Sequence, residues 1–515
     1  MMVMKGIVKQ KMNTSMKNIK NTLLIGFLIL GLSSCDDFLE VPSETNLTSA
    51  TFFQSQNDFE KAVNGAYAPL RGLFASGANA ATGSWLMGEM HSDNTRYKYN
   101  PNFRATIDQE NIADFTVIPT NSAALNKYRG YYSIVARANQ ILSSIDDIDF
   151  DVAVKDNLKG EALFLRALSY FDLVQYFGRI PLHLEPSTSL TDVALPLSEV
   201  SDIYTQIISD ATQAASLLPV KSVQQPGRAT SGAAKTLLGN VYVVQEDWSA
   251  AETILKEVVN SGEYTLVANY ADVFRTTNKN NSESVFEVQY RQGQDGYSSN
   301  FVYSFFPMPI TAPELTATMA NYGVTPAAVN GLVQEGYNIP SPDIIAAYEV
   351  GDERKAASIG TATAGGVDYP FILKYLHPHT TAALTDDNWP IYRYAEVLLF
   401  LAEALDEQGK SAEALPYLNE VRDRAGLDDI GSTTNLRDVI FNERRVELAF
   451  ENKRWLDLVR TGRAVDVITA FGAKVKANPV NYYFPPGQAP VPAAFTQIDL
   501  TFPLPADEAL LTPYF

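Results

Sequence analysis

The chain of 515 residues carries 59 acidic and 40 basic side chains, which gives a formal net charge of −19 at pH 7. Binding to nucleic acid or to an anionic membrane surface requires clustered Lys and Arg, so this charge argues against both partners. The length predicts roughly two to four domain-sized units with a large buried core.

The N-terminal 34 residues have the features of a lipoprotein signal peptide. A short apolar run, Leu23–Leu32, follows basic residues and ends in small residues directly before Cys35, the single cysteine of the chain. We expect cleavage before Cys35 and acylation of that residue. We favour Met16 as the true start, because Met1 would give an unusually long basic region. The alternative is an ordinary secretory peptide with an unrelated cysteine.

The chain after the signal peptide carries no signal for a membrane span. No later segment reaches eighteen consecutive apolar residues, so the sequence predicts no transmembrane helix. With Cys35 acylated, no second cysteine remains to form a disulfide, and the fold depends on its core. We expect a body that is held at the membrane by acyl chains.

Helical periodicity marks several segments of the mature chain. Apolar residues recur at helical spacing over 59–73, 125–145 and 158–177, and Gly178 follows the last segment as a helix stop signal. These segments predict a mainly α-helical protein.

Two further segments show the spacing of tetratricopeptide repeats. Small residues stand twelve positions apart, Gly239 with Ala251 and Ala402 with Ala414, and each second one is followed four residues later by a leucine. Small side chains at these positions allow two helices to cross closely. We expect stacked helix pairs here, and the alternative is two unrelated helical hairpins.

Residues 265–388 and the chain from Ala477 onward have a different composition. They are rich in Gly, Ser, Asn, Pro and aromatic residues, with one strand-like run at 285–290. Such segments predict irregular structure. Long irregular segments in a compact protein are commonly functional, so we expect the ligand side of the molecule here.

A search for catalytic and metal-binding motifs gives little. The pair His377 and His379 has no Glu or Cys at a zinc-ligand spacing, and the acidic run 146–151 lacks the glycine and closing glutamate of a calcium loop. The pairs Asp146/Asp147 and Asp386/Asp387 could serve a glycosidase, but the sequence does not place either in a cleft. Hydrolase and phosphate-loop motifs are absent. The sequence therefore predicts no enzyme, no cofactor and no metal site.

The segment 443–460 combines acidic, basic and aromatic residues at high density. Opposite charges recur there at i, i+3 and i+4 spacing on a predicted helix. We expect buried ion pairs that fix this helix to its neighbours, and a catalytic role is the alternative.

The 26 tyrosines suggest a sugar-binding surface, because many of them fall outside the helical stripes. An aromatic face packs against the C–H face of a pyranose, and Asn, Gln, Arg and Asp suit its hydroxyl groups. Core packing is the competing explanation for each single tyrosine. The candidates occur in two loop clusters: Asn94, Arg96, Tyr97 and Tyr99 in the first, and Tyr290, Tyr297 and Tyr303 in the second.

Several long, collinear blocks resemble the SusD/RagB family of nutrient-binding outer-membrane lipoproteins of Bacteroidetes. The resemblance spans essentially the whole mature chain. It rests on the blocks 35–39, 160–167, 177–181, 227–234, 393–399, 443–448 and 454–460.

This resemblance implies a fold and a domain organisation. The expected fold is mainly α, with four tetratricopeptide-like helix pairs as a superhelical scaffold and a large loop-rich part carrying short strands. We expect the signal peptide at 1–34 and the body at 35–515. Within the body, the scaffold should cover about 125–262 and 388–470, and the ligand-side part about 75–124, 263–387 and 471–515.

The resemblance also implies a function. Family members lie on the cell surface over a SusC-like TonB-dependent transporter and pass oligosaccharides to it, or peptides in some branches, and they are not enzymes. The acidic residues after Cys35 resemble the family's surface-export signal. By location, the two loop clusters that include Arg96 and Tyr297 resemble the ligand-holding loops of the family. A surface hydrolase and a protein-binding repeat adaptor remain as alternatives.

Overall fold

A computed structural model describes most of the chain, and Cys35 with the predicted signal peptide lies outside the described residues. One compact unit extends from Ser55 to Phe515. The described residues are 52–75, 83–102, 107–187, 189, 194–293, 295–327, 329, 336–512 and 514.

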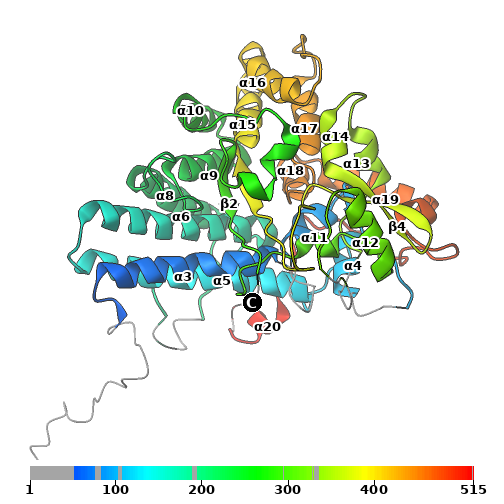
Figure 1. The fold of residues 1–515 in the computed structure, drawn as a ribbon. Coiled ribbons are helices and arrows are strands. Elements are labelled where there is room, and N and C mark those ends of the chain that lie inside the picture. The colour runs from blue at the N-terminus through cyan, green and yellow to red at the C-terminus, as the bar shows by residue number, and fades with distance from the viewer. Residues whose placement is uncertain are drawn as a thin grey trace, which may run out of the picture. The chain divides into compact units, whose positions relative to one another are not determined.

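Within this described part, eight helices pack as four consecutive pairs, and each pair also contacts the next along the chain (Figure 1). This arrangement confirms the predicted fold class. The pairs are α3 (Gln56–Phe74) with α5 (Ser122–Leu142), α6 (Val152–Phe177) with α8 (Val200–Leu217), α9 (Ser231–Val244) with α10 (Trp248–Asn260), and α15 (Tyr394–Glu407) with α16 (Ser411–Arg424).

The scaffold helices begin and end where their local sequence favours it. Asn121, Asp151 and Thr230 each cap a helix by accepting backbone N–H groups with a side-chain oxygen. Helix α6 ends at Gly178, whose φ of +69° is readily adopted only by glycine. The paired helices start at Gln56 and end at Arg424, so they begin earlier and end earlier than the predicted scaffold of 125–262 and 388–470.

Small residues mark the close crossings, as the repeat spacing predicts. A Cβ added to Gly239 would lie 2.5 Å from Leu255 of α10, so the two helices of this pair approach at that point. Ala251, Ala402 and Ala414 are fully buried at the corresponding positions. The predicted helix pairs are therefore present at both segments.

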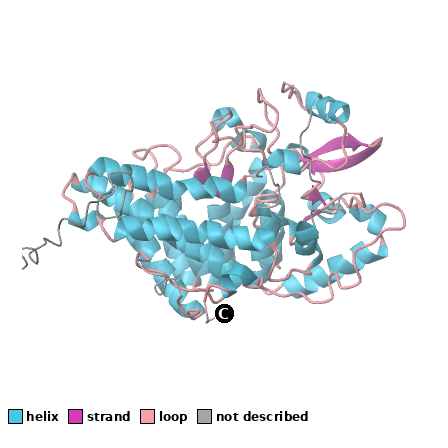
Figure 2. Cartoon of the chain, turned by 90° about the horizontal axis from the view of Figure 1, so that it is seen from below, coloured by secondary structure: helices cyan, strands magenta, loops and turns pink. Residues whose placement is uncertain are grey.

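The loop-rich part contains three two-stranded antiparallel sheets among short helices (Figure 2). Its strands are β1 (Thr95–Arg96) with β3 (Ile339–Pro340), β2 (Ser284–Val288) with β6 (Trp389–Arg393), and β4 (Ile359–Ala364) with β5 (Val367–Ile372). Its helices and turns are η2 (Leu86–Met90), α4 (Ile107–Asp114), η4 (Tyr270–Val273), η5 (Thr276–Asn278), α11 (Phe301–Ser304), α12 (Ala312–Asn321), α13 (Pro342–Ala347), α14 (Glu353–Ser358), α17 (Leu436–Glu447), α18 (Arg454–Arg460), α19 (Ala464–Ala477), η6 (Pro479–Tyr482) and α20 (Ala506–Ala509). The short turn η3 (Ile145–Asp147) connects α5 to α6 within the scaffold.

A buried ion-pair network joins the loop-rich part to the scaffold. Glu447 of α17 pairs with Arg354 of α14, Arg393 at the end of β6 and Arg424 of α16. All four side chains are at most 3% exposed. The predicted role of the segment 443–460 in buried ion pairs is confirmed, because each charged side chain there contacts an opposite charge.

Among the described residues, no helix combines the length and apolar character needed to cross a bilayer.

Candidate ligand-binding groove

A groove of about 640 Å³ opens on the loop-rich part of the molecule. Its walls come from η4 and η5, from Tyr322 directly after α12, from α14, and from the chain between β5 and β6. The Tyr270 hydroxyl donates to the backbone oxygen of Glu447 at 2.8 Å, which fixes η4 to α17. The groove is therefore built by loops that are anchored to the buried ion-pair network.

Two half-buried aromatic rings line this groove. The hydroxyl oxygen of Tyr322 accepts the backbone N–H of Thr361 at 2.7 Å, and its ring packs edge-on against Phe371 at 5.6 Å between centroids. Phe274 packs edge-on against the buried Tyr375. Both rings are held in place and keep part of their surface open. Such rings are suited to the apolar face of a sugar.

The polar groups of the groove are also held by the protein. Gln292 accepts the backbone N–H of Thr380 at 3.1 Å, and its own backbone N–H donates to Asp386 at 2.8 Å. His377 Nδ1 lies 2.5 Å from Asp387 Oδ1. These contacts orient the side chains before any ligand arrives, and preorganisation of this kind lowers the entropic cost of binding.

The floor of the groove contains Lys374, whose ammonium is fully buried. It donates to Glu451 at 2.8 Å and to the backbone oxygen of Ala449 at 2.7 Å. Burial lowers the pKa of Lys374, and the neighbouring Glu451 partly offsets that shift. Since Arg393 also pairs with Glu451, the floor is continuous with the ion-pair network.

A second groove of about 540 Å³ adjoins the first. Ala356 of α14 lines both grooves, and Thr361, whose backbone holds the Tyr322 hydroxyl, lines the second. Strands β4 and β5 supply its other wall, including the half-buried ring of Tyr369. The two grooves therefore share a wall at α14.

Two models of one family match this chain. The model described as "SusD family" matches residues 363–513, and the model described as "Starch-binding associating with outer membrane" matches residues 37–243. The chain belongs to the SusD family. The matched ranges cover most of the helix pairs and the C-terminal loop-rich segment, so the family assignment agrees with the fold.

Three relatives or solved structures of the SusD family are similar to this chain over 59% to 89% of its length. A SusD-like protein of Formosa agariphila is 27% identical over 87% of this chain and 91% of its own length. The starch-binding protein SusD of Bacteroides thetaiotaomicron is 25% identical over 59% of this chain and 64% of its own length. A structure described as a laminarin-binding SusD-like protein is 26% identical, has a TM-score of 0.72, and covers 89% of this chain and 98% of its own.

Three residues predicted to contact ligand in this SusD-family chain lie in the interior. Asn94 donates to Glu89 at 2.9 Å, and Arg96 forms an ion pair with Asp114 at 2.6 Å. The Tyr97 hydroxyl donates to Asp114 at 2.9 Å. All three are at most 2% exposed, so they have no surface from which to contact a ligand in this structure.

Two tyrosines of the second cluster are buried as well. The Tyr290 hydroxyl donates to the backbone oxygen of Arg71 at 2.7 Å, and the Tyr303 hydroxyl lies 2.7 Å from His379 Nε2. Core packing, the competing explanation, accounts for both. The histidines of the His-x-His pair also diverge, because His377 contacts Asp387 whereas His379 contacts Tyr303.

The remaining two predicted residues keep accessible surface. Tyr297 is 45% exposed, with the guanidinium groups of Arg71 and Arg291 at 4.9 and 5.4 Å from the centre of its ring. Tyr99 is half-buried and stacks on Phe484 at 5.3 Å. Ligand contact remains a prediction for these two residues.

The sequence analysis missed Phe274, Tyr322 and His377 as members of one groove. Their separation by about fifty residues each gives no motif. Gln292 was within the predicted loop cluster, but nothing in its sequence context distinguishes it from its neighbours. Only the packing of η4, α12 and the 373–386 segment brings these side chains together.

Proposed function

We propose that this SusD-family chain is a cell-surface lipoprotein that captures oligosaccharides in the groove. It is anchored through Cys35 in the outer membrane, passes its ligand to a SusC-like TonB-dependent transporter, and performs no reaction on it. The observation that carries the proposal is the groove itself, in which fixed half-open rings adjoin oriented amide and carboxylate groups.

Two further facts support a glycan as ligand. Relatives and similar structures are described as binding starch and laminarin. The chemistry of Tyr322, Phe274 and Gln292 also matches what a sugar requires, an apolar face beside hydrogen-bonding groups.

The decisive experiment is calorimetric titration of the mature chain carrying Cys35→Ser with a panel of oligosaccharides and peptides. Tyr322→Ala should weaken glycan binding about tenfold, because an aromatic contact of about 1.4 kcal/mol is lost. Tyr242→Ala is the matched control, since Tyr242 is also half-buried but lies on helix α9 and does not line the groove.

Product analysis after each titration separates the alternatives. Saturable binding without product supports the proposal. Turnover of the ligand would favour a hydrolase, with the His377 and Asp387 pair as the first groups to replace. Binding of peptides alone would favour the peptide-importing branch, and binding of proteins through the helical scaffold would favour a repeat adaptor.

A further inference from the structure

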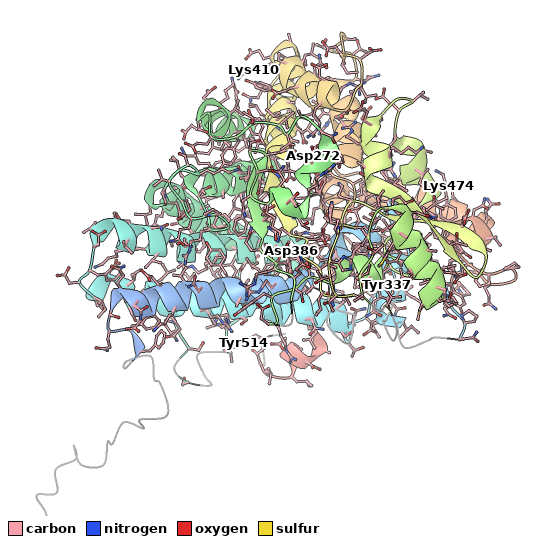
Figure 3. All side chains as sticks on the ribbon, in the orientation of Figure 1. Asp272, Tyr337, Asp386, Lys410, Lys474 and Tyr514 are labelled. Atoms are coloured by element: carbon pink, nitrogen blue, oxygen red, sulfur yellow. The ribbon has the colours of Figure 1, made fainter. Side chains whose placement is uncertain are left out.

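The charged side chains of the groove are neutralised within the protein. Each Lys, Arg or Asp that lines the groove has an opposite charge at 2.5 to 2.8 Å: Arg275 with Asp272, Lys374 with Glu451, and Asp386 with Lys279. The imidazole of His377 contacts Asp387. Asp272 and Asp386 are labelled in Figure 3. The groove therefore presents hydrogen-bonding groups with almost no net charge.

Positive side chains also lie around the groove: the Arg71 guanidinium is 4.9 Å from the centre of the Tyr297 ring, and the Lys98 ammonium is 4.9 Å from the Tyr369 ring of the adjoining groove. Arg291, beside the exposed ring of Tyr297, pairs with Asp295. The adjoining groove carries Lys355 and Asp368, one side chain of each sign, while its Asp352 is neutralised by Arg354. In the sequence, the segments between residues 52 and 515 that the structure does not describe hold a single basic residue, Arg104.

The rest of the molecule repels anions. The formal net charge is −19, and removal of residues 1–34, which hold five lysines and no acidic residue, makes it more negative. A sulfated or uronic acid-containing polysaccharide would have to approach against this field and would find each groove cation already occupied. Its anionic groups would have to compete there with the acidic partners of these cations.

We propose that the ligand is an uncharged polysaccharide chain, and that polyanionic chains are rejected by the same groove. This inference rests on the proposed function and narrows its substrate class. An uncharged chain can bind through the fixed aromatic faces and the oriented polar groups alone, and the negative net charge of the protein does not repel it.

The test uses one polysaccharide backbone in two forms. A neutral glucan that binds the mature Cys35→Ser chain is compared by calorimetry with the same glucan after chemical sulfation, at two salt concentrations. We expect sulfation to weaken binding at least about tenfold at low salt, with a smaller loss at high salt, because added salt screens repulsion. Tighter binding of the sulfated form, weakened by salt, would overturn the inference.

A panel in which only sulfated or uronic chains bind would also overturn it, while leaving the proposed glycan-binding function intact. Failure of every glycan, neutral or charged, would instead refute the proposed function and this inference with it. The two failures are therefore distinguishable.

A matched pair of variants tests the neutralised groove directly. Asp272→Asn frees Arg275 at the groove and should strengthen binding of the sulfated glucan about two- to fivefold. Glu257→Gln makes the same charge change but frees Lys235, which lies on helix α9 and does not line the groove. We expect no such gain there. An equal gain in both variants would mean that net charge, and not the groove, decides selectivity.

Discussion

At the scale of single residues, Glu89 shows how burial competes with hydrogen bonding. The carboxylate is fully buried and accepts hydrogen bonds from Asn94 and from the backbone N–H groups of Phe450 and Asn452. Burial outweighs these contacts and raises the pKa of Glu89 from 4.5 to about 7. The folded protein therefore retains this proton at a pH where the unfolded chain has lost it.

This shift predicts a pH dependence of stability. Between about pH 4.5 and pH 7 the native state binds more protons than the unfolded state, so the free energy of unfolding should fall as pH rises, by about 3 kcal/mol in total from Glu89. Urea unfolding at pH 5, 6, 7 and 8 measures the slope. Glu89→Gln should reduce the dependence of the free energy of unfolding on pH, whatever the substitution does to stability at a single pH.

Glu199→Gln is the control for this measurement, because Glu199 is an exposed glutamate at the start of α8. It should keep the slope of the unmodified protein. Equal slopes in the two variants would show that Glu89 does not hold its proton in the native state.

The sequence analysis was weakest in deciding which single aromatic residues are buried and which are accessible. Composition pointed to aromatic residues in loops, but it could not separate Tyr303, 2% exposed, from Tyr322, which lines the groove. Tyr303 lies in the short helix α11 and Tyr322 directly follows α12, and both belong to the loop-rich part. Tyr303 is buried because its hydroxyl finds His379, a partner 76 residues away, and no local pattern encodes such a contact.

At the scale of elements, a substitution at Gly239 can test the close crossing of α9 and α10. Gly239→Ala places a Cβ 2.5 Å from Leu255, so the pair α9 and α10 must separate or repack. We expect a loss of about 1 to 3 kcal/mol in the free energy of unfolding. Gly65→Ala in α3 is the control, because a Cβ there meets no atom within 4 Å.

The control should gain about 0.5 to 1 kcal/mol, since alanine favours a helix interior over glycine. Denaturant titration of both variants gives the comparison. Similar effects of the two substitutions would mean that helix propensity, and not the crossing, determines the value at Gly239.

The scaffold elements were predicted well because their signals are local. Periodicity located α3, α5 and α6 to within a few residues, with the largest error at the start of α6, and Gly178 correctly ended the last. The sheets of the loop-rich part were not predicted in detail. Strand β1 has two residues, and its partner β3 lies more than 240 positions away, so neither has a recognisable pattern of its own.

At the scale of the whole molecule, the proposed anchor predicts where the protein is found. Cys35→Ser removes the acylation site while leaving the compact unit that begins at Ser55 unchanged. We expect the variant to leave the membrane fraction and to bind glycan as before. Membrane fractionation followed by immunoblotting measures this, with the unmodified chain as reference.

Retention of the Cys35→Ser protein in the membrane fraction would mean that another feature attaches it. Loss of glycan binding along with release would mean that the N-terminal segment contributes to the groove.

The floor of the groove and the exposed loop next to its lining residue Gln292 are held in different ways. Lys374 in the floor contacts Glu451 within the ion-pair network, whereas Tyr297 and Arg291 lie on an exposed loop. Substitution of such an exposed side chain usually changes stability by less than about 0.5 kcal/mol, but breaking a buried ion pair costs about 3 to 5 kcal/mol. The loop beside the groove can therefore change by mutation while the same framework keeps folding, which lets the surface around the ligand evolve toward new sugars.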